Sequence, residues 1–316
     1  MNIDGKKGNK IIEGIFVIAI ATVFMLIGMY YLPLIIFLYP IFFIVLGVRN
    51  GVKYNIISLI ISSLFVGLII DNVSGIFILL IFAPLSIGLN YMIKKRRKSF
   101  EIIAISTVIL LVSFLLVINI MGDMSGVSII SQLEDSFTQA LNSQIEILKD
   151  MDLSAYEVLK IRDLLENAMD YVLLILPAIV IIFSLVISYL NYLISSLILR
   201  RLGYGIVSIP KFSKFKLPNN VLLGTGIMFL GAFIIKGLKL FYYETILLNI
   251  TVIASFMFFT QGLSVVDYKL IEKNLGRIPR LLIILFFTII LPLGWLISFI
   301  GILDVIIDFR KLRRPA

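Results

Sequence analysis

The side chains that most often carry enzyme chemistry are scarce in this sequence. It contains no Cys and no His, which excludes disulfides, thiolate and imidazole metal ligation, cysteine nucleophiles and histidine acid–base catalysis. Catalysis would have to use Asp, Glu, Lys, Ser or Tyr. The sequence also has no phosphate-binding loop, dinucleotide fingerprint, zinc motif or Gly-x-Ser-x-Gly elbow. We therefore expect no metal and no cofactor.

One pair of carboxylates could carry acid–base or cation chemistry. Asp304 and Asp308 are four residues apart, so a helix would place both on one face. Basic residues follow directly, at Arg310, Lys311 and Arg314. An Asp/Arg cluster at a helix end is also typical of an ion-paired anchor. The pattern favours the anchor, and the carboxylate dyad stays the alternative.

Polar side chains recur on one face of two apolar segments. They are Asn55, Ser58 and Ser62 in the segment at 54–70, and Ser184, Ser188, Asn191, Tyr192 and Ser195 in the segment at 171–199. Small polar residues on one face usually indicate close helix packing with interhelical hydrogen bonds. The alternative is a polar lining for a ligand cavity. We expect Gln261, in a later segment, to form an interhelical hydrogen bond.

Other residues that stand out have structural interpretations. Several ionisable side chains lie near the ends of apolar segments, where they reach the membrane interface: Glu13, Asp71, Lys236, Lys239, Glu244 and Asp267. Three glycines, Gly224, Gly226 and Gly231, lie inside one segment, and we interpret them as sites of close helix packing.

Long apolar segments must position these residues. The chain of 316 residues is 60% apolar and 15% charged, whereas a soluble domain is about half apolar and about a quarter charged. The apolar segments lie at 11–32, 34–48, 54–70, 75–93, 102–121, 171–199, 220–237, 242–263 and 281–307. Repeated runs of about 18 or more apolar residues indicate membrane spans. The sequence predicts an all-α polytopic transmembrane helix bundle of eight or nine membrane segments.

The charges are sorted along the chain. Residues 122–170 hold ten of the 19 acidic side chains but only three of the 28 basic ones. Basic clusters, the densest at 94–98, lie at the ends of apolar segments. Because cytoplasmic loops retain Lys and Arg, we expect a cytoplasmic N-terminus and an extracytoplasmic 122–170. The charge rule favours a C-terminus on the cytoplasmic side, which would require a break in the last segment near Pro292. The alternative is a last segment that crosses once and leaves the basic tail outside as an exception.

We expect the acidic region to form a helical hairpin. Ile130, Leu133, Phe137, Leu141, Ile145 and Leu148 fall at helical spacings and predict one apolar face. The pairs Ser131–Glu134 and Ser154–Glu157 fit the capping-box spacing, which predicts helices at 131–149 and from 154, with a turn near 150–152. The second helix is expected to enter the next span without a break. Gly203 is the predicted C-cap of that span.

The predicted organisation therefore has three regions. Residues 1–121 form an N-terminal membrane bundle of five segments. Residues 122–170 form the extracytoplasmic hairpin, and residues 171–316 form a C-terminal membrane bundle with basic cytoplasmic loops.

Short motifs in the C-terminal half resemble the YybS-like family of bacterial integral membrane proteins of unknown function. Their positions are Pro210, Phe212, Phe215 and Pro218, then Gln261 and Ser264, then Asp304, Asp308 and Arg310. The first six spans are similar, more faintly, to the substrate-binding subunits of energy-coupling-factor transporters, which share a long first helix and a short second one. This second similarity implies a transporter-like role.

Three functional hypotheses follow. The first is a non-catalytic, transporter-like protein that binds a small molecule or a partner within the bundle. The second is a membrane scaffold for envelope-assembly or signalling partners, and the third is an intramembrane enzyme. We expect contact with membrane lipid, and a protein partner at 122–170 or at the basic cytoplasmic loops. We do not expect nucleic acid, because orientation already explains the basic clusters. The expected location is the bacterial plasma membrane.

Overall fold

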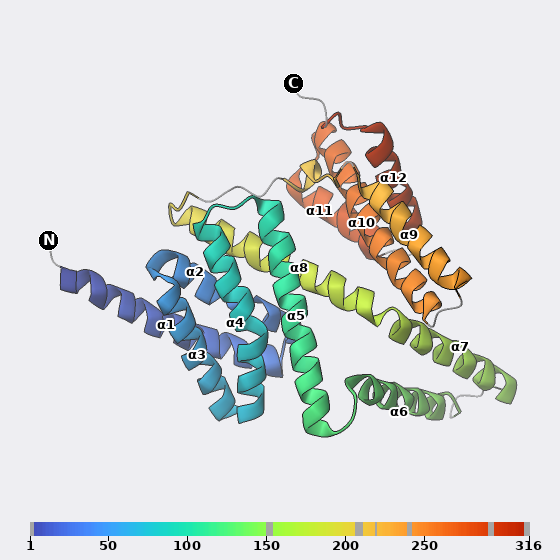
Figure 1. Cartoon of the computed structure of the whole chain (residues 1–316), viewed down its shortest axis with the longest axis horizontal. Coiled ribbons are helices and arrows are strands. Elements are labelled where there is room, and N and C mark those ends of the chain that lie inside the picture. The colour runs from blue at the N-terminus through green and yellow to red at the C-terminus, as the bar shows by residue number, and fades with distance from the viewer. Residues whose placement is uncertain are drawn as a thin grey trace. The chain divides into compact units, whose positions relative to one another are not determined.

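We describe the chain from a computed structural model, over residues 3–149, 154–205, 211–218, 220–238, 242–289 and 294–312. Every regular element within these ranges is a helix (Figure 1), which confirms the predicted all-α class. The elements are α1 Ile3–Tyr30, the 3-10 helix η1 Pro33–Leu38, α2 Pro40–Asn50, α3 Val52–Ile69, α4 Asn72–Lys94, α5 Ser99–Ser125, α6 Ile129–Lys149, α7 Ala155–Leu174, α8 Leu176–Arg201, the 3-10 helix η2 Phe212–Lys214, α9 Val221–Gly237, α10 Tyr243–Glu272, α11 Arg277–Ile289 and α12 Gly294–Ile307.

Seven helical segments in the described part of the chain are long and apolar enough to cross a membrane, judged by length and composition. They are α1 from Lys10, η1 with α2, α3, α4, α5, α8 and α10. The pair α11 and α12 would make an eighth span, bent by 111°. The helix α9 is apolar but has only 17 residues. The nine predicted segments therefore all correspond to helices. The predicted break at Pro292 lies outside the described residues.

By its contacts the chain divides into two compact units. Unit 1 comprises Met1–Leu153 and Phe183–Ile209, and unit 2 comprises Ser154–Ile182 and Pro210–Ala316. The helices α6 and α7, expected to form the hairpin, belong to different units, and the turn at 150–152 lies outside the described residues. The hairpin and the three-region organisation therefore stay predictions.

In unit 1 the helices α3, α4 and α5 lie side by side, and α1 and α2 pack on α3 (Figure 1). Two glycines allow the backbones of α3 and α4 to approach closely. A Cβ on Gly75 would lie 2.8 Å from the Cα of Gly67 and 2.8 Å from the carbonyl oxygen of Ser63. Backbone atoms cannot move aside as a side chain can, so only glycine fits. The apolar core of unit 1 includes buried aromatic side chains such as Phe43 and Phe82.

In unit 2 the helix α10 packs against α12 and α9 (Figure 1). A Cβ on Gly262 would lie 1.9 Å from the Ile297 carbonyl oxygen, and one on Gly301 would lie 1.9 Å from the Phe258 carbonyl oxygen. These two glycines make the close crossing of α10 and α12. The three glycines of α9 were predicted to be sites of close helix packing, and that prediction is wrong. No described atom lies within 4 Å of a Cβ built on Gly224, Gly226 or Gly231.

A break at Ile175 separates α7 from α8, so the prediction of one continuous helix is wrong. A side chain from α10 replaces one backbone hydrogen bond of the helix at this point. Asn249 Nδ2 donates to the Leu174 carbonyl at 2.8 Å, and its Oδ1 accepts from the Ala178 N–H at 2.6 Å. In a continuous helix that carbonyl and that N–H would bond to each other. Pro177, which has no N–H, removes the neighbouring bond.

The predicted helix ends are partly right. Ser154 caps α7, and its N–H donates to Glu157 in return, which confirms that capping box. Gly203 ends α8 with a φ of 83°, as predicted. The prediction of a capping box at Ser131 is wrong, because α6 begins two residues earlier. The Ser128 hydroxyl instead accepts from the Ser131 N–H at 3.0 Å.

Candidate functional site

The predicted polar face of α3 is buried in unit 1, and two of its three side chains bond to neighbouring helices. Asn55 and Ser62 are 0% exposed and Ser58 is 3% exposed. Asn55 Oδ1 accepts from the Ser86 hydroxyl of α4 at 3.0 Å, and the Ser62 hydroxyl lies 2.9 Å from that of Thr22 on α1. Interhelical hydrogen bonds of this kind hold membrane helices together, which favours the packing interpretation of this face.

The predicted polar face of α8 is buried in unit 1 as well, but most of its groups are not bonded. Four residues of this face are 0% exposed: Ser184, Ser188, Asn191 and Ser195. Their hydroxyl oxygens and the Asn191 Oδ1 have no hydrogen-bond partner among the described residues, and neither has the hydroxyl of Ser196. Asn191 Nδ2 does donate, to the Phe37 carbonyl at 2.7 Å.

The unbonded polar groups of α8 carry an energetic cost that bonded groups on other helices avoid. A buried polar group without a partner costs about 1–3 kcal/mol relative to one that is bonded. The serines of α5 avoid this cost locally, because the hydroxyls of Ser106 and Ser113 donate to carbonyls one turn earlier, at 2.6 and 3.0 Å. The serines of α8 make no such bond. The remaining predicted residue on α8, Tyr192, places its hydroxyl 3.1 Å from that of Ser99.

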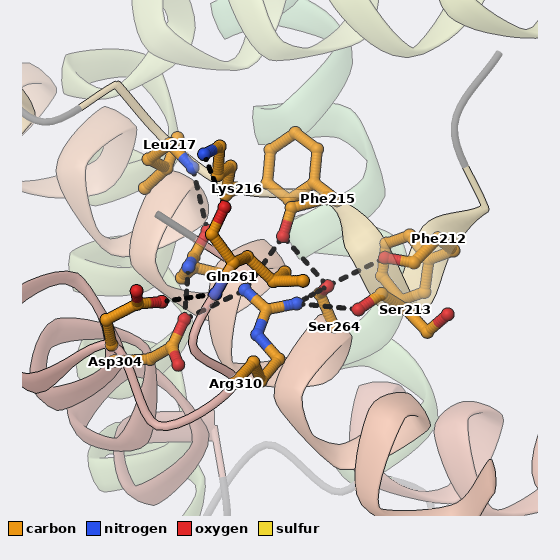
Figure 2. Close-up of polar contacts among 11 residues, drawn as sticks. Phe212, Ser213, Phe215, Lys216, Leu217, Gln261, Ser264, Asp304 and Arg310 are labelled. Atoms are coloured by element: carbon orange, nitrogen blue, oxygen red, sulfur yellow. Dashed lines mark hydrogen bonds and ion pairs between the residues drawn. The ribbon is translucent and has the colours of Figure 1, made fainter. Parts of the chain in front are cut away.

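A second group of polar side chains lies in unit 2, where three segments meet (Figure 2). Gln261 and Ser264 come from α10, Asp304 comes from α12, and Arg310 follows the end of α12. They surround the segment at 212–217, which contributes backbone groups. The motif positions that are separated in the sequence are therefore in direct contact.

Arg310 is the centre of this group. Its Nη1 donates to the Ser213 carbonyl at 2.8 Å and to the Ser264 hydroxyl at 2.6 Å. Its Nη2 donates to the Phe215 carbonyl at 2.8 Å and to Asp304 Oδ2 at 2.8 Å. One guanidinium thus fixes three chain segments at once, which its rigid fork of donors allows and a lysine ammonium would not.

Gln261 joins the same carboxylate to the loop. Its Nε2 donates to Asp304 Oδ2 at 2.6 Å, and its Oε1 accepts from the Leu217 N–H at 2.9 Å (Figure 2). This is the interhelical hydrogen bond predicted for Gln261. The Ser264 hydroxyl donates to the Phe212 carbonyl at 2.7 Å. With these bonds the segment at 212–217 is tied to α10 and α12 at four backbone positions.

The arrangement is an ion-paired anchor and not a pair of carboxylates. The side chains of Arg310 and Asp304 are 0% and 2% exposed, and their charges compensate each other. The expectation that Asp308 shares a helical face with Asp304 is wrong, because α12 ends at Ile307 and Asp308 has a φ of 53°. Its Oδ1 accepts from the Leu312 N–H at 3.1 Å. The two carboxylates therefore have separate structural roles.

The other motif positions contribute little through their side chains. Phe212 and Phe215 accept hydrogen bonds with their carbonyls, and their rings are stacked at a centroid distance of 6.5 Å. Pro218 is exposed, and Pro210 lies outside the described residues. The backbone groups of Ser213 and Leu217 could not have been found from sequence, because any residue type supplies a carbonyl or an N–H.

Three of the ionisable residues near segment ends, Glu13, Asp71 and Asp267, are ion-paired or cap a helix, whereas Lys239 lies outside the described residues. Glu13 of α1 lies 2.6 Å from Arg49 of α2. Asp71 accepts from the N–H groups of Val73 and Ser74 at the start of α4, and from the Ser74 hydroxyl. These hydrogen bonds, above all the one from the Ser74 hydroxyl, hold the pKa of Asp71 below its usual range.

Comparison with known proteins gives two matches. Residues 19–305 match the family described as a predicted membrane protein (DUF2232). The chain is 24% identical over 313 residues to the uncharacterized protein YybS of Bacillus subtilis strain 168, covering 97% of this chain and 99% of that protein. No solved structure matches. The similarity to the YybS-like family is thereby confirmed, whereas neither match bears on the fainter similarity to transporter subunits.

Proposed function

The chain belongs to the DUF2232 family of predicted membrane proteins, and on that premise we propose that it is a non-catalytic, transporter-like protein that binds a polar small molecule between the helices of unit 1. The ligand would contact the polar face of α8. We place the protein in the bacterial plasma membrane with its N-terminus in the cytoplasm, on the charge distribution described above.

The unpaired polar atoms of α8 carry this proposal. Four hydroxyls and one amide oxygen within 13 residues of one helix lack partners among the described residues. A helix that served only for packing would be more stable with Ala at the serine positions, because it would then bury no unbonded hydroxyl. The cost is understandable if the face meets a polar molecule in another arrangement of the helices. Donors and acceptors at helical spacing would suit hydroxyl, amide or carboxylate groups.

A neighbouring helix adds a further unpaired acceptor within unit 1. Asn90 of α4 is 0% exposed and its Oδ1 has no described partner, although its Nδ2 lies 3.4 Å from the Ile44 carbonyl. Close packing surrounds it, since a Cβ on Gly47 would lie 2.0 Å from that Nδ2. The unit therefore buries unbonded acceptors on α4 as well as on α8.

The scaffold hypothesis gains less support. It expects an exposed apolar stripe on α6 that a partner could cover. Only Ile130 has more than half of its surface exposed among the residues predicted to form that stripe. Leu141 and Ile145 are 5% and 6% exposed. The stripe is therefore less exposed than the scaffold hypothesis expects.

Mass spectrometry of molecules released from the purified protein tests the proposal. The wild-type protein is compared with a Ser188→Ala, Ser195→Ala variant, which removes two unpaired hydroxyls of α8. The matched control, Ser106→Ala with Ser113→Ala, removes two hydroxyls of α5 that are bonded. We expect a polar small molecule with the wild type and the control, and at least about tenfold less with the α8 variant. Equal amounts in all three proteins, or none in any, would count against the proposal.

A further inference from the structure

Unit 2 contains a cleft that the proposed function does not use. Its volume is about 620 Å³. It lies between Lys211–Ser213, the last two turns of α10 with the turn that follows them, and the start of α11. All of its lining residues belong to the described part of unit 2. The charged ones are Lys211, Asp267, Arg277 and Arg280.

The cleft carries an excess of positive charge. Asp267 compensates one cation, because its Oδ1 lies 3.1 Å from Arg280 Nη1. That contact also fixes the Arg280 side chain, whose Nε–H is buried and has no acceptor among the described residues. Lys211 and Arg277 form no ion pair with a described acidic side chain. Two uncompensated cations and one unused N–H therefore lie at one cleft.

The start of α11 adds to the positive potential of the cleft. Hydrogen bonding to the preceding turn begins with the Arg280 N–H, which donates to the Gly276 carbonyl at 3.4 Å. The N–H groups of Arg277 and Ile278 precede it and have no acceptor within the helix. Gly276 has no side chain that could cap them. Helix N-termini of this kind favour negatively charged ligands.

The anchor described above holds one wall of the cleft in place. Ser213 accepts from Arg310 Nη1 at 2.8 Å and Phe212 accepts from the Ser264 hydroxyl at 2.7 Å (Figure 2). Both residues line the cleft. These bonds hold the wall in place before any ligand binds. Binding would therefore cost less conformational entropy.

We propose that this cleft binds a phosphate group, carried either by an anionic lipid headgroup or by a free phosphorylated molecule. A phosphate monoester has a charge of about −1.5 to −2 at neutral pH, which matches the two uncompensated cations. Arginine binds phosphate through two parallel N–H groups. The cleft is larger than one phosphate, and Ile271 and Leu275 give it an apolar part for the remainder of the ligand.

Two binding measurements on the full-length protein separate the two sources. In the first, the protein is placed in nanodiscs of phosphatidylcholine with or without phosphatidic acid, and bound lipid is counted by native mass spectrometry. In the second, glycerol 3-phosphate is titrated at constant ionic strength and the shift in thermal stability is recorded. A lipid site responds to phosphatidic acid alone, and a site for soluble phosphate responds to glycerol 3-phosphate. Either response supports the proposal.

A pair of double variants shows whether the cleft is the site. Lys211→Gln with Arg277→Gln removes the two uncompensated cations. Lys214→Gln with Lys273→Gln removes two exposed cations that do not line the cleft. We expect the first variant to lose at least about tenfold in affinity for the responding probe, and the second to bind like the wild type. Equal loss in both variants, or no response to either probe, would overturn the proposal. Both variants leave α8 unchanged, so this result is independent of the proposed function.

Discussion

Arg310 Nη2 lies 2.8 Å from Asp304 Oδ2, and neither side chain is more than 2% exposed. The pair is enclosed in unit 2, and the same guanidinium also bonds two backbone carbonyls and the Ser264 hydroxyl. A buried charge is tolerated only when it is paired and bonded in this way. The contact therefore predicts what happens when either partner is removed.

Arg310→Met should destabilise the protein strongly. It leaves the Asp304 carboxylate buried without a cation, and breaking a buried pair costs about 3–5 kcal/mol. Replacing Asp304 by Leu as well removes the isolated charge, so the double variant should be more stable than Arg310→Met alone. Thermal stability in detergent, followed by size-exclusion chromatography, measures both effects. Strictly additive losses from the two substitutions would show that the pair is not coupled.

Gly301→Ala should separate α10 from α12. The new methyl group would lie 1.9 Å from the Phe258 carbonyl oxygen and 2.8 Å from the Gly262 nitrogen. Overpacking of this kind costs about 1–3 kcal/mol, and more where backbone atoms are involved. Gly224→Ala is the matched control. It meets no described atom within 4 Å and should be neutral or stabilising by up to about 1 kcal/mol. Similar thermal stability of the two variants would contradict the packing described for unit 2.

The cap at Asp71 should make the stability of unit 1 depend on pH. The pKa of Asp71 is lowered in the folded protein, mainly by the Ser74 hydroxyl and then by the Ser74 N–H. A group with a lowered folded pKa stabilises the protein above its unfolded pKa, about 3.9, and this contribution is lost as the pH falls through the folded value.

Asp71→Asn keeps the capping geometry but does not titrate. The wild type should therefore lose more thermal stability than the variant between neutral pH and about pH 3. Identical pH profiles for the two proteins would mean that the carboxylate of Asp71 contributes nothing through ionisation.

Removing the unpaired hydroxyl of Ser188 should not destabilise the protein. Ser188 is 0% exposed and its oxygen has no described partner, so Ser188→Ala removes only an unsatisfied group and should be neutral or stabilising by about 1 kcal/mol. Ser86 is equally buried but donates to Asn55 at 3.0 Å. Ser86→Ala should cost about 1–2 kcal/mol. A larger loss for Ser188→Ala than for Ser86→Ala in the same thermal assay would contradict the difference between the two helices.

Much of the fold could be predicted because it depends on local patterns. Apolar runs located the nine segments, and the capping box at Ser154 and the glycine at Gly203 located helix ends. The hydrogen bonds at the Ile175 break could not be predicted, because they come from Asn249, more than 70 residues away in the sequence. The local signal of that break is Pro177, which has no N–H to donate within a helix.

The candidate sites, too, could be predicted only as far as local spacing and short motifs allow. Spacing alone placed Ser188 and Asn191 on one face of α8, and the motifs selected Gln261, Asp304 and Arg310. Spacing could not show that α3 bonds polar groups to neighbouring helices while the serine hydroxyls of α8 lack described partners, because that depends on which helix lies opposite. It also placed Asp308 on a helix that ends one residue before it.

Cysteine accessibility at Ser188 tests the central claim most directly. The chain has no Cys, so Ser188→Cys introduces a single thiol with little change in size. Ile187→Cys is the control, because Ile187 is 5% exposed and lies in the apolar core of unit 1. If the polar face of α8 opens to a polar ligand, a small water-soluble thiol reagent should modify Ser188→Cys at least about tenfold faster than Ile187→Cys. Equal protection of both thiols in the folded protein would contradict the proposed binding face.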